Sequence, residues 1–288
     1  MNRIVKKTQL SAEVFLLEIE SPLISRERKP GQFIILQIDT AIGERIPLTI
    51  ADADPVRGTI TLIFQTVGKT THLLAEKQVG DSIAALLGPL GQPTRIEKVG
   101  HVVCVGGGIG VAPVHPIAQA MKAAGNKVTV IMGARYKSLL IMEEQMRKIA
   151  DALIIVTDDG SYGRKALVTE PLKELCAQTP QPDMVVVAGP PIMMKFCAET
   201  TRPFGVHTVV SLNTIMIDGT GMCGGCRVTV GGKTKFVCVD GPEFDGHQVD
   251  FDNMMKRLRA YKPREEADHK DHHCRLEAAA NALGKEHA

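Results

Sequence analysis

The sequence predicts a two-part fold, in which an antiparallel β-barrel is followed by a doubly wound, parallel α/β domain. Two patterns carry this prediction. Up to residue 97, short apolar strands alternate with turns rich in Pro, Gly and Asp, and from His101 onward short buried strands alternate with helices. A third pattern begins near residue 213, where glycines and cysteines become frequent and indicate a small additional module.

The first part, residues 1–97, is expected to be the barrel. Apolar strands are predicted at 14–19, 33–38 and 59–64, where Ile, Leu, Phe and Thr dominate. Dipeptides containing proline at 30–31, 54–55 and 88–89 predict turns. Short strands at this spacing are typical of a small antiparallel barrel.

The second part, residues 98–212, is expected to be the α/β domain. Strands alternate with helices, which predicts βαβ units and a parallel sheet covered on both faces. The expected strands are 102–105, 128–132, 153–156, 184–188 and 207–212, and the expected helices are a segment ending at Ala124, then 139–150, 167–176 and 192–200. Residues 213–250, with β-like pieces at 227–230 and 235–239, form the third unit, and residues 251–288 form a helix and charged tail.

Composition excludes several classes of function. The chain has 288 residues, 44% hydrophobic and 23% charged, with a net charge of +2, which argues against a basic nucleic-acid-binding protein. No apolar run reaches the roughly 18 residues of a membrane helix, and acidic residues interrupt the N-terminal apolar stretch, so neither a membrane span nor a signal peptide is expected. Seven unevenly spaced cysteines argue against a disulfide framework. We therefore expect a cytoplasmic protein.

The strongest motif is the series Asp218, Cys223, Cys226 and Cys238, with the spacing D-x4-C-x2-C-x11-C. Plant-type [2Fe–2S] sites use C-x4-C-x2-C with a distant fourth cysteine. Glycines between these residues let the backbone wrap closely around a cluster. Aspartate at the first position keeps the negative charge but supplies a harder oxygen ligand. A structural zinc site, and an incomplete site in which Asp218 is only a turn residue, are the alternatives.

The second motif is a glycine-rich loop between a predicted strand and a predicted helix. It does not match G-x-G-x-x-G, because valine occupies the last position. Glycines here either allow a pyrophosphate to approach the helix N-terminus or allow tight packing of the strand on the helix. The candidate nucleotide-binding residues of this loop are Gly107, Gly108, Gly110, Val111 and Pro113.

Further candidate residues lie in the barrel and after the fourth α/β strand. A basic side chain in each of two barrel segments could neutralise phosphates, and a strand end in a doubly wound sheet faces the ligand crevice. Each segment also fits an ordinary turn or helix start. These residues are Arg45, Ile46, Pro47, Leu48 and Thr49; Gly68, Lys69, Thr70 and Thr71; and Gly189, Pro190 and Pro191.

In this order the motifs resemble those of ferredoxin–NADP reductase-type flavoproteins that carry an additional [2Fe–2S] module. The resemblance covers residues 1–250 and implies that 45–49 bind FAD and that 106–113, 133–135 and 189–191 bind a pyridine nucleotide. One departure is Leu48, where plant reductases have a tyrosine against the flavin.

Two branches of this family are similar to the chain. Electron-transfer subunits of dihydroorotate dehydrogenase B are expected to have four cysteines at the cluster. Small subunits of NADH-dependent reduced ferredoxin:NADP oxidoreductases are expected to have aspartate in place of the first, as Asp218 is here. The resemblance to the second branch implies a large partner subunit with its own FAD, two [4Fe–4S] clusters and an NADP(H) site, which performs flavin-based electron bifurcation and contacts ferredoxin.

The implied chemistry is an electron relay from NAD(H) through FAD to the [2Fe–2S] cluster. It requires no side-chain general base, so no catalytic residue is predicted. Asp158 follows the third α/β strand, where an acidic group disfavours a 2′-phosphate, whereas Arg135 and Lys137 favour one. Family resemblance favours NAD(H). The alternative function is electron transfer to dihydroorotate dehydrogenase, and a distant alternative is a zinc-stabilised binding protein.

The C-terminal tail contains His269, His272, His273 and Cys274, which suggest metal binding. Charged neighbours at 264–266 and 270–271 are more typical of a solvated helix, and we favour that interpretation.

Overall fold

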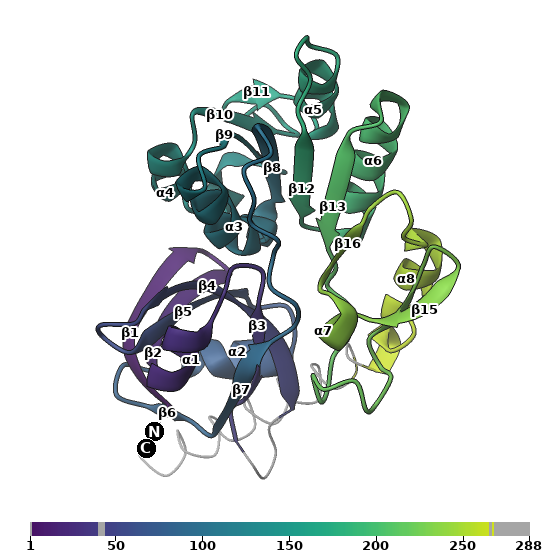
Figure 1. The fold of residues 1–288 in the computed structure, drawn as a ribbon. Helices are drawn as coiled ribbons and strands as arrows, with labels where there is room; N and C mark the ends of the chain where they lie inside the picture. The colour runs from purple at the N-terminus through teal and green to yellow at the C-terminus, as the bar shows by residue number, and fades with distance from the viewer. Residues whose placement is uncertain (1, 40–43, 265–266, 268–288) are drawn as a thin grey trace, which may run out of the picture.

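The computed structural model describes residues 2–39, 44–264 and 267. Within these residues the chain forms two seven-stranded sheets and one two-stranded sheet. Figure 1 shows the first sheet as a barrel below, the second with its helices above, and the segment after residue 212 beside both. None of the described helices is long and apolar enough to cross a membrane.

The barrel strands are all antiparallel and follow the order β6-β1-β2-β5-β4-β3-β7. The two outermost strands are almost consecutive in the chain, so the sheet nearly closes on itself. Its interior is filled by apolar side chains such as Leu17, Leu62 and Phe64. The elements are β1 (Asn2–Ser11), β2 (Val14–Glu20), α1 (Pro22–Glu27), β3 (Phe33–Gln37), β4 (Arg45–Asp54), β5 (Thr59–Gln65), α2 (Lys69–Glu76), β6 (Ser82–Ile83) and β7 (Ala85–Leu90).

One turn predicted in the barrel is wrong. Gly88 and Pro89 lie inside β7 and are joined by a cis peptide bond. Since β7 is the last strand of the sheet and pairs only with β3, the missing N–H of Pro89 leaves no ladder partner unsatisfied. Helix α1 was not predicted, because its six residues are too few for a helical period to show.

The second sheet is the expected doubly wound one. Counting β8, β9, β10, β12 and β13 in chain order, the strands are arranged 3-2-1-4-5, and all are parallel. Helices α3 and α4 cover one face, while α5 and α6 cover the other. The elements are β8 (His101–Gly107), η1 (Gly108–Gly110), α3 (Val111–Ala123), β9 (Lys127–Ala134), η2 (Lys137–Leu139), α4 (Glu143–Ile149), β10 (Ala152–Thr157), β11 (Arg164–Lys165), α5 (Thr169–Cys176), β12 (Met184–Ala188), α6 (Pro191–Thr201), η3 (Arg202–Phe204) and β13 (His207–Ser211).

This strand order fixes where a ligand can bind. Strand β8 lies between β9 and β12 in the sheet. The connection after β8 runs toward β9, and the connection after β12 runs the opposite way toward β13, so the two loops diverge. In doubly wound sheets the crevice at this switch point, at the carboxyl ends of the strands, is where ligands bind. The glycine-rich loop and the Gly189–Pro190–Pro191 segment both lie there.

Two predicted elements are shorter than expected. The helix predicted at 139–150 is confined to α4, because Met142 has a left-handed backbone with φ of 60° just before it. The β piece predicted at 235–239 ends at Phe236 and gives way to the helical turn α7 (Val237–Asp240). Asp240 accepts a hydrogen bond from the N–H of Phe236, which stabilises this turn.

The last unit contains the hairpin β14 (Arg227–Val230) and β15 (Lys233–Phe236), then α7, β16 (Glu243–Asp245) and α8 (Phe251–Leu258). Strand β16 pairs antiparallel with β13, so this unit extends the second sheet instead of forming a separate body. Asp250 caps α8 by accepting a hydrogen bond from the N–H of Asn253, as expected of a helix N-cap. The predicted His/Cys cluster of the tail lies outside the described residues.

Candidate functional site

The glycine-rich loop brings three backbones into contact at the switch point. A Cβ atom on Gly110 would lie 2.2 Å from the carbonyl oxygen of Ala188, and one on Gly106 would lie 2.9 Å from the Cα of Val111. Both distances are too short for any side chain. These two glycines therefore allow β8, α3 and β12 to pack closely, which was one of the two roles that the sequence left open.

Gly108 differs from its neighbours. It has a positive φ of 54°, and a Cβ there would meet no atom within 4 Å. Its backbone thus faces open space immediately before the N-terminus of α3, a 13-residue helix. Unpaired N–H groups and the positive end of a helix attract phosphate at such a position. Of the predicted loop residues, Gly108 is the one whose geometry suits close approach of a pyrophosphate.

Sequence reasoning missed the side chain that lies over this crevice. The sulfur of Met193 lies 2.2 Å from where a Cβ of Gly107 would be, and its methyl carbon lies 2.6 Å from that of Gly189. Met193 is only partly buried and therefore lines the crevice between the two predicted nucleotide segments. Its unbranched thioether can adjust its shape to a ligand. Its sequence context, a Met-Met pair in a helix, is typical of core or interface packing and does not indicate a ligand contact.

Two further predicted residues meet at the neighbouring strand ends. The N–H of Asp158 donates to the carbonyl of Ala134, and the N–H of Asp159 donates to the carbonyl of Arg135. Arg135 is exposed, and its guanidinium lies 5.8 Å from the centre of the Tyr136 ring. These backbone bonds place the residues that follow β9 and β10 side by side, and the roles of Asp158 and Arg135 in recognising an adenosine ribose stay predictions.

The barrel residues predicted to bind FAD lie on one strand and one helix end. Residues 45–49 begin β4, and Thr49 pairs with Phe33 of β3. Arg45 is exposed and the next four side chains are partly exposed, although they lie in a strand. Immediately after Thr49, Ile50 is buried in the barrel core and Ala51 is buried against α3, where His115 contacts the carbonyl of Ala51. This strand therefore leads from the barrel surface to the nucleotide domain.

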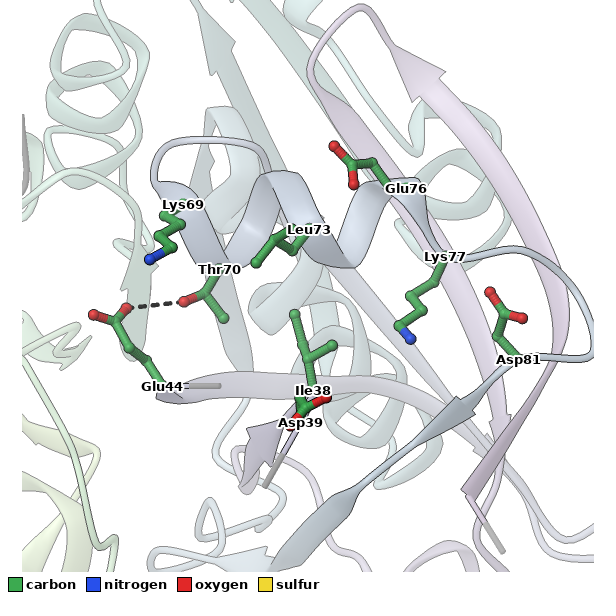
Figure 2. A pocket seen from close by; sticks show the side chains of 9 residues that line it. All are labelled: Ile38, Asp39, Glu44, Lys69, Thr70, Leu73, Glu76, Lys77 and Asp81. Carbon is green, nitrogen blue, oxygen red and sulfur yellow. Dashed lines mark hydrogen bonds between the residues drawn. The ribbon is translucent and has the colours of Figure 1, made fainter. Parts of the chain in front are cut away.

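The N-terminus of α2 lies beside the start of β4. Thr70 donates a 2.8 Å hydrogen bond to Glu44, which precedes Arg45, and Figure 2 shows Lys69 on the same side. The hydroxyl of Thr71 accepts hydrogen bonds from the N–H groups of Val67 and Gly68. Within the described residues Lys69 and Arg45 have no ion-pair partner, so both are available for an anion.

A pocket of about 300 Å³ opens along α2 (Figure 2). Carboxylates outnumber basic groups in its lining, so phosphate binding is favoured only at the end where Lys69 lies. The lining residues are Ile38, Asp39, Glu44, Lys69, Thr70, Leu73, Glu76, Lys77 and Asp81.

The four predicted cluster ligands form two pairs. The sulfur atoms of Cys226 and Cys238 lie 3.3 Å apart and are buried. Asp218 and Cys223 form the outer pair: the Cys223 N–H donates a 2.7 Å hydrogen bond to the Asp218 carboxylate, and Cys223 is exposed. Two thiolates on one tetrahedral metal lie roughly 3.8 Å apart for metal–sulfur bonds of about 2.3 Å. The inner pair is thus close to that spacing.

The arrangement of the four candidate ligands as two pairs fits a two-iron cluster better than a zinc ion. A [2Fe–2S] cluster takes two protein ligands on each iron, whereas structural zinc draws four ligands to one point. Among the described residues, no three His, Cys, Asp or Glu side chains are close enough to hold one metal ion. Burial, and then the neighbouring Cys226 thiol, raise the pKa of Cys238 to about 12, so a bound cation is needed to favour the Cys238 thiolate at neutral pH.

Asp218 also organises the loop. Its carboxylate accepts hydrogen bonds from the N–H groups of Thr220, Met222 and Cys223. Burial pushes its pKa upward, but these backbone groups outweigh that effect and hold the pKa below its usual value. The aspartate is therefore both a candidate ligand and the residue that shapes the ligand loop.

A shallow hollow of about 340 Å³ lies at the boundary where the cluster loop meets the barrel. The N–H and side-chain amide of Gln92 donate to the carbonyls of Gly241 and Val239, which joins the end of β7 to the segment after Cys238. The lining residues are Pro89, Leu90, Gly91, Gln92, Gly219, Thr220, Cys238 and Val239. The barrel and the cluster loop are therefore held directly against each other.

Comparison with known proteins identifies two of these regions. Residues 213–250 match the iron–sulfur cluster binding domain of dihydroorotate dehydrogenase B, and residues 104–199 match the oxidoreductase NAD-binding domain. A homologue of the dihydroorotate dehydrogenase B electron-transfer subunit from Thermotoga maritima is 50% identical over 265 residues, covering 92% of this chain and 93% of the relative. The electron-transfer subunit from Bacillus caldolyticus is 33% identical over 254 residues, covering 85% and 96%.

The chain belongs to the family of dihydroorotate dehydrogenase B electron-transfer subunits and their homologues. A solved structure of an NADH-dependent reduced ferredoxin–NADP oxidoreductase, described in connection with flavin-based electron bifurcation, contains a chain 47% identical to this one. The match has a TM-score of 0.90 and covers 95% of this chain and 98% of the other. A ferredoxin–NADP⁺ reductase from Neisseria gonorrhoeae with bound FAD and NADP is 19% identical, with a TM-score of 0.61 over 71% of this chain and 90% of that one, which shows the shared fold.

These findings confirm the predicted resemblance, the fold class and the assignment to NAD-linked, iron–sulfur oxidoreductases of this family. They agree with the predicted set of FAD, NAD(H) and a [2Fe–2S] cluster. The assignment of individual binding residues stays a prediction.

One carboxyl group that the sequence did not predict as important lies where the segment leaving the barrel meets the second sheet. Glu243, the first residue of β16, accepts a 2.5 Å hydrogen bond from the hydroxyl of Thr94, in the segment that leaves the barrel. Burial raises the pKa of Glu243 to about 7, although the Thr94 hydrogen bond opposes the rise. No sequence signal could have found it, because the two residues are 149 positions apart.

This carboxyl predicts that stability falls as pH rises toward neutrality. A group whose pKa is higher in the folded chain stabilises the fold fully below its unfolded value, near 4.5, and loses that contribution as pH rises through about 7. The Glu243→Gln variant should therefore be more stable than the parent at pH 8, by roughly 1–3 kcal/mol, and equal to it near pH 4.5. Urea unfolding of the full chain across this range measures the difference.

Glu97→Gln is the matched control, because Glu97 is an exposed carboxylate paired only with Arg95. We expect its unfolding free energy to follow that of the parent at every pH. Parallel curves for Glu243→Gln and the parent would contradict the assigned pKa.

Proposed function

We propose that this chain is the electron-transfer subunit of an electron-bifurcating NADH-dependent reduced ferredoxin:NADP oxidoreductase. The observation that carries the proposal is the 47% identity and TM-score of 0.90 to a chain of such an enzyme, over nearly the whole length of both. Asp218, at the first position of the cluster motif, agrees with this branch of the family. The proposed site of action is the cytoplasm.

In this proposal the nucleotide domain holds NAD(H) across the switch point. The backbone of Gly108 and the N-terminus of α3 face the pyrophosphate, with Pro113 in the first turn of that helix. The loop at Pro190–Pro191 forms the opposite wall. Arg135 and Asp158 contact the adenosine ribose. The Asp158 carboxylate accepts hydrogen bonds from the ribose hydroxyls and disfavours a 2′-phosphate.

The barrel holds FAD along β4. Arg45 and Lys69 neutralise its pyrophosphate beside Gly68 and Thr71, and Thr49 lies midway along the strand that leads to the nucleotide domain. Bound there, the flavin converts hydride transfer into single-electron transfer. Beyond Thr49, Ala51 is buried against α3, so the strand meets the nucleotide domain there.

The cluster loop supplies Asp218, Cys223, Cys226 and Cys238 as ligands of a [2Fe–2S] cluster. Cys238 of the inner pair lines the hollow beside β7, and Cys223 of the outer pair is exposed. A cluster held by these residues would face the barrel at Cys238 and a partner at Cys223. The chain therefore supports transfer of single electrons between them.

The proposed partner is a larger subunit that carries its own FAD and [4Fe–4S] clusters, binds NADP(H) and contacts ferredoxin. The relatives are named as electron-transfer subunits, which supports a partner of this kind. A second function, electron transfer to a dihydroorotate dehydrogenase catalytic chain, is favoured by the match of residues 213–250 to that enzyme's iron–sulfur domain.

Anaerobic affinity purification of this chain from its native cells tests the two functions. We expect a partner that contains flavin and [4Fe–4S] clusters, together with NADH- and NADP-linked ferredoxin chemistry in the purified complex. A dihydroorotate dehydrogenase catalytic chain in its place would support the second function instead. A chain containing zinc but no iron or sulfide would contradict both.

Gly68 provides a test of the flavin site that separates binding from folding. Its φ of −150° suits any residue and a Cβ there would meet no atom within 4 Å, so Gly68→Ala should change the unfolding free energy by no more than about 1 kcal/mol. The added methyl group would nevertheless occupy the space required by the pyrophosphate. We expect FAD affinity, measured by flavin fluorescence titration, to fall by about tenfold or more.

Val67→Ala is the control for this variant, because Val67 is 75% exposed and its truncation adds no atoms. It should bind FAD like the parent chain. Unchanged affinity in Gly68→Ala would place the pyrophosphate elsewhere.

The role of Asp218 can be tested by exchanging the ligand type. Asp218→Ala removes both the oxygen ligand and the three hydrogen bonds of the loop, so we expect loss of the cluster while FAD stays bound. Asp218→Cys restores an anionic ligand without the carboxylate, and it should retain iron with an altered electron paramagnetic resonance spectrum.

Iron and sulfide content, measured on anaerobically purified protein, separates the two roles of Asp218. Loss of iron in the alanine variant with retention in the cysteine variant is the result expected of a ligand. Unchanged iron content and spectrum in Asp218→Ala would show that the cluster uses another ligand.

A further inference from the structure

Glu243 occupies the seam where the barrel, the second sheet and the cluster-binding unit meet. Its strand β16 pairs with β13, and Ser211 lies directly opposite it. From the barrel side, the Pro30–Gly31 turn packs on the carboxyl group so closely that a Cβ on Gly31 would lie 2.7 Å from its oxygen. From the segment after β7, Thr94 donates its hydroxyl to the same oxygen.

No positive charge neutralises this carboxyl group. Among the described residues it forms no ion pair, and its hydrogen-bond donor is the hydroxyl of buried Thr94. On β8, burial and then the charge of Glu243 raise the pKa of the Cys104 thiol to about 12. Arg95, next to Thr94, is exposed and paired with Glu97. Asp245, two residues along β16, accepts hydrogen bonds from His247 and Gln248.

The same seam connects the flavin strand to the cluster loop. The carbonyl of Gln32 accepts a hydrogen bond from Ile50, the residue after Thr49, and the Gln32 side chain donates to the carbonyl of Gly91. The adjacent Gln92 is bonded to Val239 and Gly241, which follow Cys238. Glu243 is five residues beyond Cys238, on the chain segment that leaves the cluster loop and that these bonds hold against the barrel.

We propose that Glu243 is the proton-binding residue of the electron relay, taking up a proton from water when the iron–sulfur cluster gains an electron and releasing it when the electron leaves. The inference rests on the proposed function. The electron originates from the reduced nicotinamide, the proton comes from solvent, and the O–H bond of the carboxyl is the bond that forms and breaks. Thr94 holds the carboxyl in place as a positioning residue.

Electrostatics determines that Glu243 takes up its proton on reduction of the cluster and releases it on oxidation. Burial without a counter-charge already raises the pKa of Glu243 to about 7, so the group is close to the balance between its two forms at physiological pH. An added negative charge nearby raises that pKa further and draws in a proton. By linkage, the proton in turn stabilises the reduced cluster, so its reduction potential falls as pH rises.

The test is an anaerobic redox titration of the full chain loaded with FAD and cluster, followed by electron paramagnetic resonance between pH 5.5 and 9. We expect the cluster potential of the parent to fall with pH around neutrality. In Glu243→Gln, which keeps an oxygen that can accept from Thr94, the potential should be independent of pH. In Thr94→Val, which removes a hydrogen bond that favours the charged form, the pH-dependent region should move to higher pH.

Infrared difference spectra of the reduced and oxidised states provide a second readout. The parent should gain a protonated-carboxyl band on reduction, and Glu243→Gln should not. A flat potential in the parent, or the same slope in Glu243→Gln, would overturn this inference alone while leaving the proposed function intact. A chain that takes up no iron–sulfur cluster would overturn both.

Discussion

The close approach of three backbones at the switch point is the constraint on which the rest of the architecture depends. Ala188 at the end of β12 lies against Gly110, and Val111 at the start of α3 lies against Gly106, with no room for a side chain at either glycine. This contact sets the direction of α3. The same helix then packs on β4 and buries Ala51, so the packing at the switch point also positions β4, the strand that carries the residues proposed to bind FAD.

A second constraint holds the cluster-binding unit in place, and it consists mostly of backbone hydrogen bonds. Gly241 accepts from Gln92, and Pro242 accepts from Leu212, so the segment after Cys238 is joined to both the barrel and the second sheet within a few residues. Strand β16 then completes the sheet beside β13. Two side-chain bonds, from Gln92 to Val239 and from Thr94 to Glu243, add to these backbone bonds.

The sequence predicted the features that local pattern controls. The parallel strands were predictable because runs such as 102–105 and 184–188 are apolar throughout, and the cluster motif because its ligands lie within 21 residues. Local pattern did not predict that α4 begins only at Glu143, which depends on the left-handed backbone of Met142, or that Gly106 and Gly108 have opposite roles. Met193 and Glu243 lacked any signal, since the neighbours that give them meaning are distant in the chain.

The two pairs of candidate ligands differ in burial, which would suit a carboxylate in a position that other members of the motif give to a thiolate. Cys226 and Cys238 are buried, where a carboxylate, which water solvates more strongly than a thiolate, would lose more on leaving water. Asp218 lies with exposed Cys223 on the outer side, where water still solvates an oxygen ligand. Its three backbone hydrogen bonds fix the loop before any metal binds. A harder ligand is therefore tolerated at the outer position and not at the inner ones, and the outer pair is the side that a partner can reach.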